Sequence, residues 1–226
     1  MTDGTVLVHQ SCSGNWYELA PDKFGNYTTG QWTATPIASM PSGYSPLYFS
    51  SAVLPDGRLV VIGGEYNGNG CAAHAETNLG AIYDPVANLW TSLPSPPGWS
   101  QFGDATNVVL PKGNLLLAQN SSTGIAELNP YTLTWTNLNS SGKAGANAEE
   151  GWTLLPDGTV LTVDVEPAGQ SERYFPSTDS WGTLGDTSVP LIASREMGPQ
   201  VLRPDGTVFA SGVTGHTGIY NSLSET

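Results

Sequence analysis

The chain has 226 residues and a formal net charge of −13, from 20 acidic and 7 basic side chains. This balance argues against nucleic acid and against an anionic membrane surface as partners, because both are bound through clustered Lys and Arg. It suits a cation, a neutral polar ligand such as a sugar, or solubility alone. The sequence shows no signal peptide and no run of about 20 apolar residues that could cross a membrane.

Composition favours β-structure. The chain contains 27 Gly and 17 Pro, and no long segment places apolar residues at helical spacing. The many Thr, Val, Trp and Tyr residues suit short strands joined by tight turns. We therefore expect an all-β fold, which at this length is commonly a single domain.

One short pattern occurs five times along the chain. An apolar run leads into a turn that reads Pro-Asp-Gly or a close variant, and a second apolar run follows. The clearest copy spans residues 155–161, and the others begin at Met1, Leu54, Leu110 and Arg203. Asp-Gly between two β-rich runs is a strong hairpin signal, because Gly accepts the positive φ of a tight turn. Five such hairpins indicate a repeat protein.

Each predicted hairpin is followed by a third strand and, in four of the five repeats, by a fourth strand that contains Trp. The four tryptophans are Trp32, Trp90, Trp135 and Trp181. In the fifth repeat, Thr226 is reached at the place where the Trp is expected. The turn positions 3, 56, 112, 157 and 205 are 53, 56, 45 and 48 residues apart. Four short strands at this period are typical of a propeller blade.

Residues 51–94 also carry a recognisable motif. Ile62-Gly63-Gly64 follows the second strand, Tyr83-Asp84-Pro85 lies on the third, and Trp90 on the fourth. In these features the chain resembles the kelch repeat, although the double glycine is intact only in this copy. The resemblance implies a β-propeller of four-stranded antiparallel blades whose innermost strands line a central channel.

About five blades are expected, of which three are complete and the two terminal ones are partial. The expected blade limits are about 1–44, 45–99, 100–148, 149–196 and 197–226. The chain is then either a five-bladed ring or a fragment of a larger propeller. We expect a monomer for a closed ring and a dimer for an open one, because an open fragment exposes apolar blade faces.

Alignment of the repeats on the last Leu of each inner strand predicts a ring of polar side chains. Tyr48, Asp104, Glu149 and Glu196 occupy equivalent positions, so three carboxylates and a tyrosine would surround one mouth of the channel. Further ligand contacts are expected from Glu150, Arg195, Trp99, Trp152 and Glu65. Hydrogen-bonding loop positions are expected at Tyr66, Asn67, Asn120, Asp164 and Glu166.

Three chemistries fit such a ring. A protonated and an ionised carboxylate among Asp104, Glu149 and Glu196 could hydrolyse a glycosidic bond as acid and as base or nucleophile. The same three acids could instead bind a hard cation such as Ca²⁺. Alternatively, the acids could accept hydrogen bonds from sugar hydroxyls while an aromatic ring stacks on the face of the sugar. The plainest alternative is that each acid accepts backbone hydrogen bonds or is solvated.

The placement of the histidines bears on whether the chain could be a copper enzyme. Kelch-type propellers that resemble galactose oxidase hold copper through two Tyr, two His and a Cys linked to one Tyr. Here His9, His74 and His216 are scattered, which disfavours a copper oxidase. If the chain is an enzyme, the acids therefore favour a glycoside hydrolase or lyase over a copper oxidase.

Cys12 and Cys71 both fall between the second and third strands, in adjacent repeats. We expect a disulfide that joins two blades, rather than two reduced thiols, and hence an oxidising compartment. The leading functional hypothesis is an extracytoplasmic binding module for a glycan or another neutral or cationic ligand. The alternatives are a carbohydrate-active hydrolase or lyase and a protein-interaction scaffold.

Overall fold

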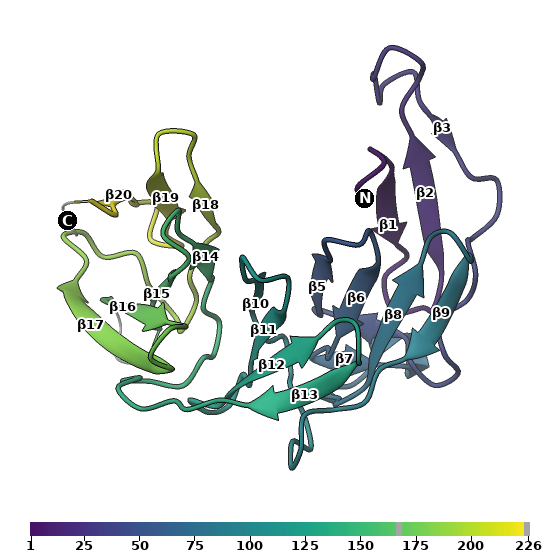
Figure 1. The fold of residues 1–226 in the computed structure, drawn as a ribbon. Coiled ribbons are helices and arrows are strands. Elements are labelled where there is room, and N and C mark those ends of the chain that lie inside the picture. Colours follow the sequence, from purple (N-terminus) through teal and green to yellow (C-terminus); the bar gives the residue numbers. More distant parts are fainter. Residues whose placement is uncertain (166–168, 224–226) are drawn as a thin grey trace. The chain divides into compact units, whose positions relative to one another are not determined.

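The computed structural model describes residues 1–165 and 169–223, and these residues are almost entirely β-strand and turn (Figure 1). Among them, no helix is long and apolar enough to span a membrane. The chain forms two compact units, Met1–Gly103 and Asp104–Thr226. The expected all-β class is confirmed, because the described residues contain only one short helical turn, Asn69–Cys71.

The first unit contains two main sheets and one small one. The first sheet consists of β1 (Val6–His9), β2 (Trp16–Ala20) and β3 (Gln31–Trp32). The second sheet consists of β5 (Ser50–Val53), β6 (Leu59–Ile62), β8 (Gly80–Asp84) and β9 (Leu89–Ser92). The small sheet pairs β4 (Pro46–Leu47) with β7 (Tyr66–Asn67), and η1 (Asn69–Cys71) follows it.

The second unit contains three sheets. The third sheet of the chain consists of β10 (Asn107–Val109), β11 (Leu115–Ala118), β12 (Ile125–Asn129) and β13 (Thr134–Asn137). The fourth consists of β14 (Thr153–Leu154), β15 (Val160–Val163), β16 (Gln170–Phe175) and β17 (Ser180–Asp186). The fifth consists of β18 (Gln200–Leu202), β19 (Thr207–Ser211) and β20 (Thr217–Asn221).

All main sheets are antiparallel, with strands in chain order, so each is a four-stranded blade or part of one. The expected three complete blades and two three-stranded terminal blades are confirmed. Within the second unit the innermost strands lie side by side, with β10 next to β14 and β14 next to β18. The strands before the repeated turns are therefore the inner ones, as the sequence predicts.

The repeated turn has one geometry. In the second blade, the N–H of Gly57 donates to Leu54 O at 2.9 Å, and Gly57 has φ 88°. Positive φ is costly for a residue with a Cβ, which explains the glycine. The turn aspartate accepts a hydrogen bond from the backbone N–H two residues further on in four copies: Asp3, Asp56, Asp157 and Asp205. This bond favours the turn over an extended chain.

The core lies between blades. All four residues of β6, of β11 and of β15 are buried, because the middle strands of a blade are covered on both faces. The fourth-strand Trp90 is buried, and its ring centroid lies 5.5 Å from that of Trp16 in the preceding blade. Trp32 differs, since β3 is only two residues long and the Trp32 side chain is 55% exposed.

Candidate functional site

The predicted ring residues are divided between the two units, with Tyr48 in the first and the three acids in the second. Asp104 is half-buried and accepts a hydrogen bond from Asn120 Nδ2. Glu149 is half-buried with φ 57°, and Glu196 is exposed and forms an isolated β-bridge with Ala193. Within residues 1–165 and 169–223, no group of three or more His, Cys, Asp or Glu side chains is placed to hold a metal ion. The three acids therefore do not form the predicted Ca²⁺ site among these residues.

Three of the predicted residues, Tyr48, Glu65 and Tyr66, lie in the first unit together with two residues that were not predicted as site residues, His74 and Glu76. We call Tyr48, Glu65, Tyr66, His74 and Glu76 the tyrosine patch. The Tyr48 side chain is 59% exposed, and its ring meets that of Tyr66 edge to face with centroids 6.0 Å apart. The Tyr66 ring meets His74 in the same manner at 5.8 Å. The patch thus presents a row of three rings.

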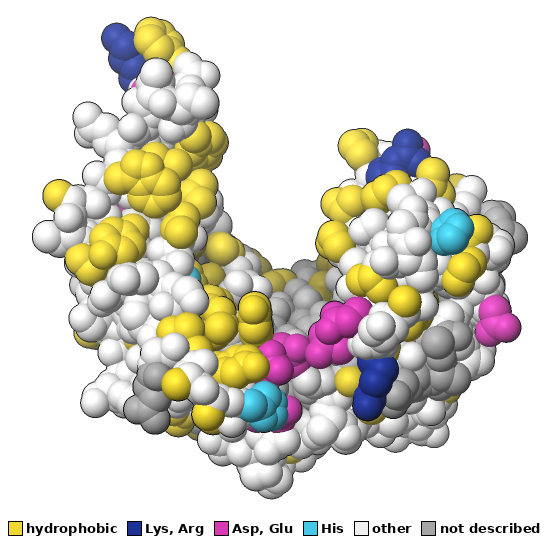
Figure 2. All heavy atoms as spheres, turned by 180° about the vertical axis from the view of Figure 1, so that it is seen from behind, with side chains coloured by type: hydrophobic (Ala, Val, Ile, Leu, Met, Phe, Trp, Pro, Cys, Tyr) yellow, Lys and Arg dark blue, Asp and Glu magenta, His cyan; other side chains and the backbone are white. Residues whose placement is uncertain are grey.

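Two carboxylates border this row. His74 Nε2 lies 3.8 Å from Glu65 Oε1 and 3.6 Å from Glu76 Oε1. Glu76 also accepts a hydrogen bond of 2.5 Å from Gln101 Nε2, which fixes its orientation. On the face drawn in Figure 2, acidic side chains and a histidine lie together beside hydrophobic ones, a class that includes tyrosine. Aromatic faces beside carboxylate acceptors can stack on a sugar ring and bind its hydroxyls, or bind an organic cation.

The backbone conformation and backbone hydrogen bonds fix the position of Tyr48. Tyr48 follows β4 directly and has φ 53°, a conformation that bulky residues rarely adopt. The N–H of Glu65 donates to Tyr48 O at 3.3 Å, and Leu47 pairs with Tyr66 in the small sheet. Backbone strain of this kind persists only where the surroundings impose it, and it is common at functional sites.

The double glycine of the motif allows the small sheet of β4 and β7 to pack closely against the segment that follows β6. Gly63 and Gly64 have φ 73° and 129°, and the N–H of Gly64 donates to Gly103 O at 2.8 Å. A Cβ on Gly64 would lie 3.0 Å from Pro46 Cβ and 3.0 Å from Tyr66 O. The small sheet can therefore pack against residues 63–64, which follow β6, only because both residues are glycines.

A disulfide holds the loop that carries the patch. Cys12 and Cys71 are bonded, with their Cα atoms 5.5 Å apart, so the pairing expected from the repeats is the one formed. Cys71 ends η1, between Tyr66 and His74 in the chain, while Cys12 lies between β1 and β2. The bond therefore ties this loop to the first blade.

The remaining predicted contacts have other surroundings. Trp99 is half-buried against Phe102, with centroids 5.8 Å apart, and Arg195 is exposed with φ 65°. Glu150 and Trp152 are 6% and 9% exposed and belong to the core instead of a ligand surface. The alignment of the repeats does not predict that these two side chains are buried. The predicted loop position Glu166 lies outside the described residues.

Sequence reasoning missed a buried ionic group in the second unit. We call Lys143, Glu150, Asp164 and Glu172 the Lys143 cluster, and all four side chains are inaccessible to solvent. Lys143 Nζ lies 2.8 Å from Glu150 Oε1 and 2.7 Å from Glu172 Oε2, and it also contacts Asp164. Glu172 additionally accepts a hydrogen bond of 2.8 Å from the N–H of Ala144.

Three carboxylates share one ammonium in this cluster, and the pKa values of Asp164 and Glu172 are shifted. Burial, and next the neighbouring Glu150 carboxylate, raise the pKa of Asp164 to about 7. Burial also raises the pKa of Glu172. Burial alone would lower the pKa of Lys143, but the three carboxylates outweigh it and the pKa is raised. The cluster joins the segment after β13 to the fourth blade and is closed to ligands, so we assign it a structural role.

Comparisons with known proteins agree on the fold. The model of the Kelch motif matches residues 46–97, the segment that contains the whole tyrosine patch. "Kelch-like protein terF" of Aspergillus terreus is 32% identical over 124 residues, which are 50% of this chain and 26% of that protein. A solved structure, "Structure of YjhT", aligns with a TM-score of 0.61 and 18% identity over 84% of this chain and 65% of that one. The chain therefore spans about a quarter of the curated relative and less than two thirds of the solved chain.

Proposed function

We propose that this chain, which has a kelch-type β-propeller fold and matches the Kelch motif over residues 46–97, acts as a binding module whose ligand site is the tyrosine patch. The kelch propeller fold supports a binding or scaffold module in general. The proposed ligand is a glycan or another neutral or cationic polar molecule. The observation that carries the proposal is the exposed Tyr48, held at φ 53° against Tyr66 beside Glu65.

Charge and chemistry support this class of ligand. The patch contains two carboxylates and no Lys or Arg, and the whole chain has a net charge of −13, so an anionic ligand would be repelled. Tyrosine offers a broad apolar face at little cost in conformational entropy, which suits the weakly apolar face of a sugar. The carboxylates and the His74 ring supply acceptors, and His74 a donor, for hydroxyl groups.

The disulfide supports a location outside the cytoplasm. Bonds of this kind persist in secreted proteins and other oxidising compartments, and reducing compartments keep thiols free. We therefore propose that the chain works as an extracytoplasmic module, with the bond between Cys12 and Cys71 formed in its working state.

The test is a binding screen of the full chain. Neutral oligosaccharides of glucose and mannose, together with oligosaccharides of glucosamine, which are cationic, are titrated and their affinities compared. Tyr48→Ala and His74→Ala should each weaken binding about tenfold or more, because each removes a contact surface. Tyr131→Ala is the matched control, since Tyr131 is 74% exposed but lies in the other unit. Equal loss in all three variants would refute the assignment, and binding to none of the probes would favour a protein-interaction scaffold.

A further inference from the structure

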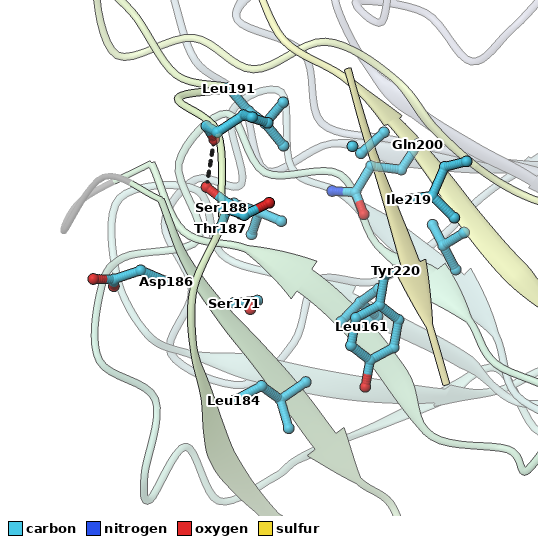
Figure 3. A pocket seen from close by; sticks show the side chains of 15 residues that line it. Leu161, Ser171, Leu184, Asp186, Thr187, Ser188, Leu191, Gln200, Ile219 and Tyr220 are labelled. Carbon is cyan, nitrogen blue, oxygen red and sulfur yellow. Dashed lines mark hydrogen bonds between the residues drawn. The ribbon is translucent and has the colours of Figure 1, made fainter. Parts of the chain in front are cut away.

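A cavity of about 400 Å³ lies between the fourth and fifth blades of the second unit. Strands β15, β16 and β17 line it on one side, and β18, β19 and β20 line it on the other (Figure 3). Two of the lining residues, Leu184 and Tyr220, pack against the buried group of Leu155, Leu161 and Val208. The walls of the cavity are therefore largely apolar, and the Tyr220 ring forms part of them.

Small side chains in the fifth blade leave this space open. Four positions after each turn glycine, a residue of the second strand pairs with a residue of the third strand. In the complete blades these pairs are Val61 with Ala81, Leu117 with Ala126, and Thr162 with Glu172. In the fifth blade the pair is Ala210 with Gly218, and both residues line the cavity. This pair has less side-chain volume than any of the other three.

In two other blades, the segment that leads into the blade fills the space beside the corresponding pair. Met40 and Tyr44 precede the second blade and are buried in one cluster with Val61 and Ala81. Lys143 precedes the fourth blade, and its Nζ lies 2.7 Å from Glu172 Oε2. Before the fifth blade, Leu191 reaches the place of this pair, since a Cβ on Gly218 would lie 3.8 Å from Leu191 Cδ1. The cavity remains beside them nonetheless.

The segment between β17 and β18, which also lines the cavity, is fixed to both blades. The N–H of Thr187 donates to Gly169 O, just before β16, at 2.7 Å. Thr214 Oγ1, between β19 and β20, donates to Pro190 O at 2.5 Å. Leu191 of the same segment is only 2% exposed. Because the segment is bonded to the fourth and to the fifth blade, the cavity is formed before any ligand binds.

One polar side chain offers a buried acceptor at the cavity wall. Gln200 Nε2 donates to Gly151 O at 2.9 Å, and this bond orients the amide. Gln200 Oε1 is buried and has no hydrogen-bond partner within the described residues, and Gln200 lines the cavity (Figure 3). Asp186 is the one charged residue among the described residues that line the cavity, and it is exposed. The interior therefore offers an acceptor but no partner for an ion.

We propose that this cavity binds a small uncharged aromatic molecule whose single N–H or O–H donor bonds to Gln200 Oε1. A cavity of roughly 150 Å³ with apolar walls holds benzene, so this one accommodates two fused rings. Removal of the rings from water favours binding, and contact with the Tyr220 ring adds to it. The donor satisfies an acceptor that is costly to leave unpaired, whereas an ion would lose its hydration without compensation. The proposal is independent of the tyrosine patch, which lies in the other unit.

The test compares two probes of the same shape, indole and benzofuran. Indole has an N–H donor where benzofuran has an oxygen atom, which is only an acceptor. Each probe is titrated into the full chain, and binding is followed by calorimetry and by the NMR signals of the Leu184 and Val208 methyl groups. Indole should bind about tenfold or more tightly than benzofuran and should shift both signals. Equal affinities, binding that leaves both signals unchanged, or no binding of indole at millimolar concentration would overturn the proposal.

Three variants locate the binding site. Ala210→Leu introduces the residue type that the third blade has at this place and should weaken indole binding about tenfold or more. Ala193→Leu is the matched control, because Ala193 is exposed in the same unit and does not line the cavity. Gln200→Met should abolish the preference for indole over benzofuran. Unchanged indole binding in Ala210→Leu would contradict the assignment. If a variant fails to fold, the comparison of the two probes on the unaltered chain still decides the question.

Discussion

Lys143 Nζ lies 2.7 Å from Glu172 Oε2 in a part of the second unit that solvent does not reach. Lys143 comes from the segment after the third blade, and Glu172 from the middle of the fourth. A charge buried in this way is tolerated only when it is paired, so the contact links the two blades and makes each depend on the other.

Replacement of Lys143 by an uncharged residue should destabilise the folded chain severely. Lys143→Met leaves three carboxylates buried without their cation and should lower the free energy of unfolding by about 3–5 kcal/mol. Lys112→Met is the control, because Lys112 also pairs with a carboxylate, Glu127, at 2.7 Å but is 57% exposed. That exposed pair should contribute about 1 kcal/mol or less. Urea denaturation of both variants makes the comparison, and equal losses would contradict the structural role of the Lys143 cluster.

The same cluster should make stability depend on pH. The pKa of Asp164 is about 7 in the folded chain and near 3.8 as a free side chain. Between these values the folded state holds a proton that the unfolded state has released. Asp164 should therefore make stability fall as pH rises from about 4 to about 7, by at most about 1.4 kcal/mol per pH unit from this one group, and its effect should then level off.

The groups that face Asp164 do not reverse this sign. The raised pKa of Glu172 adds a slope in the same direction, and Lys143 stays charged throughout, because its pKa is raised from 10.5. Acids with lowered pKa, such as Asp56, lose their contribution only below about pH 4. Melting temperatures measured from pH 5 to 8 should fall in the parent chain and fall less in Asp164→Asn. Parallel curves would show that Asp164 does not hold the proton.

The disulfide should contribute to both stability and binding. Cys12 and Cys71 are 59 residues apart, and closing a loop of this length stabilises by about 4 kcal/mol in the chain-entropy model. The double variant Cys12→Ser/Cys71→Ser should lose stability of this order and should bind glycan more weakly, because the loop before His74 is released. Denaturation with and without reductant provides the check. A parent chain that is insensitive to reductant, with both thiols open to alkylation, would contradict the bond.

The double glycine should be needed for the shape of the patch. Gly64→Ala should destabilise by about 1–3 kcal/mol and weaken binding, because the new Cβ meets Pro46 and the Tyr66 backbone. Gly68→Ala is a matched control with φ 73° and open space around the new Cβ. Both variants carry a cost of positive φ, which is larger at the φ of 129° of Gly64 than at the 73° of Gly68, so the difference between them contains the close packing together with this extra backbone cost. Equal binding in both would mean that this packing does not position Tyr48.

The fold could be predicted from the sequence because each blade repeats the same local signal. The Asp-Gly turn requires positive φ, the middle strands are apolar on both faces, and the fourth strand contains a Trp. These features are local, so they can be recognised without knowing the partners. The strand count of each blade, partial at both ends, followed from them.

The sites were harder to predict because they depend on contacts between segments far apart in the chain. Tyr48 and Glu65 were predicted separately, but only the small sheet of β4 and β7 shows that they share one patch with His74. Glu150 is predicted to contact a ligand, yet its side chain is buried and pairs with Lys143. Lys143 lies after the fourth strand of its repeat, in a segment that the alignment of the repeats does not cover, so the alignment could not pair it with these acids.

The most direct test of the account is the NMR signal of the tyrosine rings in the full chain during a titration with the tightest-binding oligosaccharide. We predict that the ring resonances of Tyr48 and Tyr66 shift and saturate with the affinity measured by calorimetry, while those of Tyr131 stay in place. Saturable binding that leaves Tyr48 and Tyr66 unchanged would contradict the central claim that the tyrosine patch is the ligand site.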